Sequence, residues 1–137
     1  AVMRTLGNPS RGAVDVGVLG AAAGAPHGRT TTAQVAAWAE FGIGQPRRSW
    51  LLDWIDANLR EVQKLQQSEM QKVVRGEQTE SQARARVGAW IVGQIQARIA
   101  AGIAPPNAES TIAKKGSSTP LIDTGQLRSS IAFRVVE

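Results

Sequence analysis

Two long stretches with helical spacing, separated by only a few residues, constrain the fold of this chain more than any other feature. The first, residues 49–75, places apolar side chains three and four residues apart along one side, as an amphipathic helix does. Ser49 is its expected cap, and its expected core positions are Leu51, Ile55, Leu59, Val62 and Leu65.

A second helix is expected to follow almost at once. Gly76 ends the first stretch, and Thr79 and Gln82 have the spacing of a capping box, in which each side chain satisfies the other's free backbone N–H. The apolar ridge of this helix is Val87, Ile91, Ile95 and Ile99, with Trp90 beside it, and Gly102 closes it. Two helices joined by so short a turn are expected to pack as an antiparallel hairpin.

Short strands are expected near both ends of the chain. Apolar residues alternate over 13–18 and again over 131–136, which is the period of a half-buried strand, so the two segments are expected to pair. A helix is expected to begin among the threonines at 30–32 and to stop at Gly42, and a shorter one to run from a cap at Asp123 through Ser130.

These elements predict an α+β fold: a long antiparallel helical hairpin packed on a small, mostly antiparallel sheet formed by the N- and C-terminal strands. At 137 residues the chain is expected to form a single domain, 1–137. Residues 1–12 are expected to be a flexible arm or a loosely held first strand, and residues 20–31 and 103–122 to be loops.

Composition excludes several classes of function. The chain has no cysteine and one histidine, His27, so disulfide scaffolds, thiol chemistry and multi-ligand zinc sites are excluded, and no metal or cofactor is expected. No apolar run approaches the roughly twenty residues that span a bilayer. The net charge of +5 favours an acidic or nucleic-acid neighbour.

No enzymatic activity is expected from the residues present. Asp53 and Asp56 stand in an early helix turn, where carboxylates favour the positive end of the helix. The triplet 123–125, Asp-Thr-Gly, is superficially similar to that of aspartic proteases, but that chemistry requires a second triplet. Ser129 and Ser130 have no histidine in the same stretch.

A basic row on the first long helix is the clearest candidate for contact with a partner. Arg60, Lys64 and Arg75 fall nearly on one line, together with Gln67 and Gln71, and are candidates to face DNA. One hypothesis is therefore a small basic nucleic-acid-binding module, although no motif for reading bases and no stacking aromatic accompanies the row.

Two separated stretches carry a resemblance to a known family. "VAAWAEFGIGQPRRSWL" is similar to a pattern of a short helix ending in Glu-aromatic-Gly, a turn, and an arginine and aromatic that open a long helix. "PPNAESTIAKKGSSTPLIDTGQLRSSI" is similar to a C-terminal block of Thr-Ile, Lys-Gly and Pro-Leu-Ile-Asp-Thr-Gly. In both, the chain resembles the small neck and tail-completion proteins of long-tailed bacteriophages, of the Mu-like virion-morphogenesis type, over residues 12–136. It departs where Ser49 stands in place of the family's frequent proline.

The resemblance implies a non-enzymatic virion protein that joins head to tail. Such a protein is expected to form a homo-oligomeric ring, a hexamer in the favoured reading and a dodecamer as the other possibility, between connector or head-completion proteins and tail-terminator or tail-tube proteins. The ring would surround double-stranded DNA in the neck of the virion, after assembly in the host cytoplasm and without contact to a membrane. The residues expected at its interfaces are Arg47, Arg48, Trp50, Lys114, Lys115, Asp123, Thr124, Gly125 and Arg128.

Overall fold

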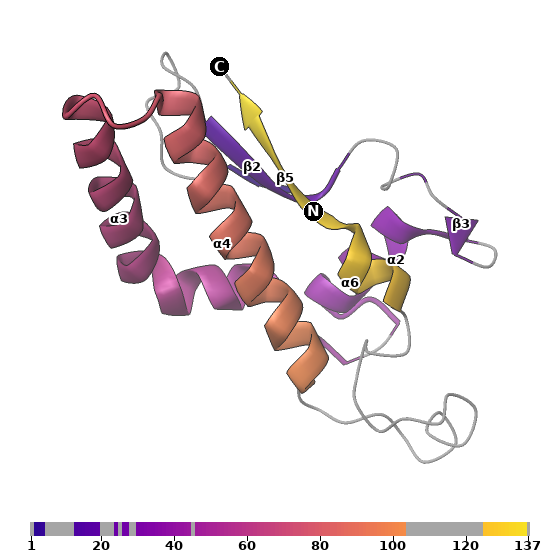
Figure 1. The fold of residues 1–137 in the computed structure, drawn as a ribbon. Helices are drawn as coiled ribbons and strands as arrows, with labels where there is room; N and C mark the ends of the chain where they lie inside the picture. Colours follow the sequence, from indigo (N-terminus) through magenta and orange to yellow (C-terminus); the bar gives the residue numbers. More distant parts are fainter. Residues whose placement is uncertain are drawn as a thin grey trace.

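The computed structural model describes residues 2–4, 13–19, 24, 26–27, 30–44, 46–103 and 125–136. Within these residues the fold is α+β, as predicted: a long helical hairpin lies against a small antiparallel sheet built from both ends of the chain (Figure 1). The predicted helix cap at Asp123, and the loop residues 104–122, lie outside the described residues.

The sheet has three strands in the order β1-β2-β5, formed by Val2–Arg4, Ala13–Val18 and Ile131–Val136. Both pairings are antiparallel, and Val16 stands opposite Phe133 in the register of β2 and β5. The predicted pairing of the 13–18 and 131–136 segments is therefore confirmed. Every residue of β2 is buried, whereas its alternating pattern predicted a half-buried strand; the difference arises because β2 is the central strand and α4 packs on the sheet.

The hairpin consists of α3, Leu52–Val74, and α4, Glu80–Ala101. Helix α4 lies across the sheet, and α3 packs on α4 away from the strands (Figure 1). The capping box of Thr79 and Gln82 is present as predicted. The ridge predicted for α4 is buried throughout, at Val87, Ile91, Ile95 and Ile99.

Helix α4 closely approaches the sheet at Gly88. A Cβ at this position would lie 2.7 Å from a ring atom of Phe133, closer than real carbon contacts allow. Glycine is therefore required here by space.

The buried side of the first long helix is the predicted one at four of five positions: Leu51 and Val62 are buried, and Ile55 and Leu65 are partly buried against the core. The exception is Leu59, which is 41% exposed, while Trp54 and Glu69 are buried in addition. The reason is that α3 has one helical partner, so only the stripe that faces α4 is covered. Trp54 meets Trp90 of α4 there, with ring centroids 5.7 Å apart.

Two shorter helices lie beside the hairpin. Helix α2, Thr32–Phe41, begins with a capping box of Thr31 and Gln34 and ends at Gly42, near the predicted bounds. Helix α6, Gly125–Ser130, leads directly into β5 and buries Leu127 completely.

The predicted loop 20–31 contains an unpredicted element. β3, Pro26–His27, pairs antiparallel with β4, Thr30–Thr31, just before α2.

Among the described helices, none combines the length and apolar character needed to cross a membrane.

Candidate interaction surface

The turn between α2 and α3 forms a rigid corner that coincides with the first of the two resembling stretches. Gly42 closes α2 in the left-handed conformation, with φ of 69°, and its backbone lies so near Arg47 that a Cβ would come within 3.0 Å of it. The Arg48 N–H donates to the Ala39 carbonyl at 2.8 Å, which folds the turn back onto α2. These backbone contacts hold the start of the turn against α2.

Glu40 caps α3 from the preceding helix. Its side chain is fully buried, and Oε1 accepts hydrogen bonds from the N–H groups of Leu51 at 2.8 Å and Leu52 at 3.3 Å. A carboxylate at the first turn also complements the positive end of the helix. The N-cap residue of α3 is Leu51 and not the predicted Ser49, whose hydroxyl accepts from the Asp53 N–H at 2.9 Å.

Charged side chains brace the outside of the corner. Arg47 donates two hydrogen bonds to Asp53, at 2.8 and 2.9 Å, and its Nη2 lies 4.0 Å from Glu40 Oε2. The hydrogen bonds from Arg47 hold the pKa of Asp53 below its usual value. On the inner side, Arg98 of α4 donates twice to the Ser49 carbonyl, at 2.8 and 3.1 Å, so the hairpin and the corner form one body.

Two residues predicted to lie at an interface are buried in the corner. Trp50 is fully buried, and its indole N–H donates to the Ala36 carbonyl at 2.9 Å. Arg48 is only 6% exposed, and burial lowers its pKa. Both were expected at an interface because they belong to the first stretch that resembles the neck proteins; within the described residues they pack inside this chain. Of the arginine pair, only Arg47 presents surface, at 48% of its side chain.

The predicted basic row is exposed but interrupted by carboxylates. Arg60 and Lys64 are exposed on α3, and Lys64 Nζ lies 3.9 Å from Glu61. Arg75 pairs with Glu77 at 3.1 Å. These neighbours offset part of the positive charge, so the row is weaker as a phosphate-binding surface than the cations alone suggest.

The second block of interface candidates lies mostly beyond what can be described. Lys114, Lys115, Asp123 and Thr124 are outside the described residues, and Gly125 begins α6. Arg128 is half-buried on α6, and its carbonyl accepts a hydrogen bond from Gln96 of α4 at 3.1 Å.

Exposed large apolar side chains lie near both ends of α3, and the sequence did not indicate them. We call the first group the corner patch: Phe41 and Ile43, each 55% exposed, with Leu52, 39% exposed. The second, the tip patch, is Met70 and Val74, 40% and 83% exposed, near the C-terminal end of α3. The sequence could have indicated these residues, because they are apolar residues that are left over once the core positions of the helices have been assigned.

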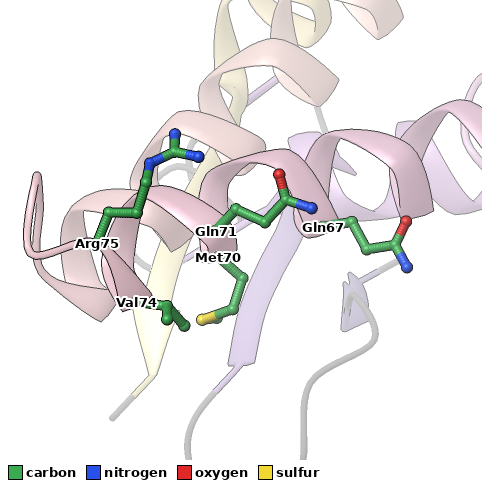
Figure 2. Close-up of a pocket in the computed structure, with 5 residues that line it drawn as sticks. All are labelled: Gln67, Met70, Gln71, Val74 and Arg75. Atoms are coloured by element: carbon green, nitrogen blue, oxygen red, sulfur yellow. The ribbon is translucent and has the colours of Figure 1, made fainter.

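The tip patch lines a shallow depression. Its lining consists of the apolar Met70 and Val74 and the polar Gln67, Gln71 and Arg75 (Figure 2). Just beside it, the buried carboxylate of Glu69 ties the hairpin end together by accepting hydrogen bonds from Gln78 at 2.7 Å and Lys72 at 3.1 Å. These hydrogen bonds, that from Gln78 first, lower the pKa of Glu69.

One further charged pair lies within the sheet. The buried Asp15 of β2 accepts a hydrogen bond from its cross-strand neighbour Arg134 at 2.8 Å. Among the described residues, no group of three or more metal-ligating side chains comes together.

Comparison of this chain with known protein families, with curated proteins and with solved structures finds no match in any of the three.

Proposed function

We propose that this chain is a structural subunit of the neck of a long-tailed bacteriophage, where copies of it form a ring that joins the head connector to the tail around the DNA. The proposal begins from the resemblance of the two sequence stretches to neck and tail-completion proteins. It assigns the chain a binding role, carried by surfaces on a rigid body.

The observation that carries the proposal is the construction of the corner. Its charged groups are used internally, since Glu40 caps α3 and Arg47 holds Asp53. Its outside presents Phe41 and Ile43, each more than half exposed. Large apolar side chains held on a braced turn are suited to contact with protein, because they are positioned in advance and lose little freedom on binding.

The ring is a physically reasonable form for so small a subunit. A chain of 137 residues buries a modest core by itself, and neighbouring copies cover further apolar surface in a closed ring. Proximity to DNA would then act through charge alone, so any affinity for DNA should fall as salt rises.

The test is assembly of particles without the gene. Filled heads and finished tails should accumulate separately, and supplying the wild-type protein, or the surface variant Glu61→Ala as matched control, should restore joining. The protein should also be found in purified virions, at the junction, by electron microscopy of labelled particles. Normal joining without the protein would refute the proposal.

The basic module is the second candidate, favoured by the exposure of Arg60 and Lys64 on α3. It predicts tight binding of the isolated subunit to duplex DNA, which filter binding at rising salt would measure. Reversing both charges should abolish that binding. A subunit that binds no DNA at low salt contradicts this candidate and leaves the neck proposal intact.

A further inference from the structure

We infer that Arg47 is a clamp with two acceptors: it bonds Asp53 on the surface, and it moves onto the buried Glu40 when Asp53 is neutralised or is bound by another cation. The corner between α2 and α3 then stays closed while Asp53 changes partners. This device goes beyond the proposed function and does not depend on it. Three features of the structure support it: an unpaired buried oxygen, the position of Arg47 beside that oxygen, and the unequal exposure of the two carboxylates.

The unpaired oxygen is Oε2 of Glu40. The side chain of Glu40 is fully buried, and its other oxygen, Oε1, already accepts hydrogen bonds from the N–H groups of Leu51 and Leu52. Within the part of the chain that the structure describes, no hydrogen-bond donor reaches Oε2. A buried carboxylate oxygen without a donor is costly, so a nearby charged donor is strongly attracted to it.

Arg47 lies close enough to supply the missing donor. Its Nη2 is 4.0 Å from Glu40 Oε2, so a movement of about 1 Å brings the two atoms within hydrogen-bond distance. In the structure the same nitrogen donates to Asp53 Oδ1 at 2.8 Å, and Nη1 donates to Oδ2 at 2.9 Å. The guanidinium has further N–H groups beyond the two that Asp53 uses.

The two acceptors differ in their surroundings. The side chains of Asp53 and Arg47 are each 48% exposed, so water competes for their ion pair. Glu40 is fully buried, and a charge interaction is stronger where water is excluded. Asp53 therefore holds Arg47 through two parallel hydrogen bonds, and Glu40 attracts Arg47 once that paired geometry is lost.

Two further charged groups face this site. Hydrogen bonding to Asp53 raises the pKa of Arg47 most, and the charges of Glu40 and Asp56 raise it further. Arg98 of α4 also acts on Asp53, but its guanidinium donates to a backbone carbonyl of the corner at 2.8 and 3.1 Å. Arg98 is therefore already engaged, and Asp56 is the acceptor that competes with Glu40 for Arg47.

A crystal structure of the Asp53→Ala variant tests the movement directly. The substitution removes both surface acceptors at an exposed position, so the protein should remain folded. Nη2 of Arg47 should then lie within about 3.2 Å of Glu40 Oε2. An Arg47 side chain that turns into solvent, or that pairs with Asp56, would overturn the inference.

A double-mutant cycle followed by urea unfolding gives an independent readout. Arg47→Met removes the charge and keeps a long side chain. In the Asp53→Ala background it should lower the urea midpoint by at least about 0.7 M, because Arg47 is then bonded to Glu40. In a background of Asp53→Ala with Glu40→Gln, the same change should shift the midpoint by less than about 0.3 M, because the buried charge is gone.

The exposed ion pair of Lys64 and Glu61 is the matched control. Its two charged atoms lie 3.9 Å apart on α3. In a Glu61→Ala background, Lys64→Met should shift the urea midpoint by less than about 0.3 M. If Arg47→Met has as little effect as this in the Asp53→Ala background, then Arg47 serves Asp53 alone and the two-acceptor clamp is refuted. None of these measurements involves particle assembly, so the proposed function stands or fails separately.

Discussion

Removing the Glu40 carboxylate should destabilise the fold more than any change at an exposed acid, because Glu40 caps a helix to which it does not belong. In Glu40→Ala, the buried Leu51 N–H loses its acceptor at 2.8 Å, and the Leu52 N–H loses a weaker one at 3.3 Å. Leaving buried donors unpaired costs about 1–3 kcal/mol each, with the partly exposed Leu52 at the lower end.

Two smaller effects act in opposite directions. Loss of a negative charge at the helix N-terminus destabilises by about 0.5–1 kcal/mol. Against this, Glu40 Oε2 is buried without a hydrogen-bond partner, so removing it relieves part of the carboxylate's desolvation. We expect a net loss of about 3 kcal/mol for Glu40→Ala, and about 1 kcal/mol for Glu40→Gln, which keeps an acceptor in place.

Urea unfolding followed by tryptophan fluorescence measures these differences. Glu61→Ala, which removes a carboxylate from an exposed site on α3, is the matched control and should change stability by no more than about 0.5 kcal/mol. In thermal unfolding, Glu40→Ala should lower Tm by about 10 °C for a chain of this size. The reasoning is refuted if Glu40→Ala lies within 1 kcal/mol of wild type, or if the glutamine variant is as unstable as the alanine variant.

Two further predictions concern stability. Gly88→Ala should destabilise by about 1–3 kcal/mol, because its methyl group meets the Phe133 ring, whereas Gly93→Ala, on the open side of α4, should be neutral or stabilise by up to about 1 kcal/mol. The urea midpoints of both variants compare them directly, and equal effects would contradict the close approach. Stability should also fall in acid: the pKa values of Asp53 and Glu69 are lowered by folding, so their contribution is present above the unfolded pKa, near 4, and is lost as pH drops through the lower folded values. A urea midpoint that does not change between pH 6 and pH 2.5 would contradict this, and Asp53→Asn should flatten part of the decline.

The sequence by itself determined the local elements. Helix ends follow from contacts within four residues, so the sequence predicted the capping box at Thr79, a helix start among the threonines at 30–32 and the stop at Gly42. The ridge of α4 was readable for a similar reason: it faces a broad apolar sheet, and every residue at that spacing is covered.

Only the tertiary structure decided that Leu59 is left uncovered on α3 and how the corner is held. Leu59 shares the helical spacing of the core residues, but burial depends on where α4 lies, and that is a property of distant segments. Glu40 and Trp50 stand at the ends of two predicted helices, and each forms a buried hydrogen bond to a partner 11 or 14 residues away along the chain. Side-chain contacts over such separations depend on the complete packing of the chain, so periodicity along the sequence carries no signal for them.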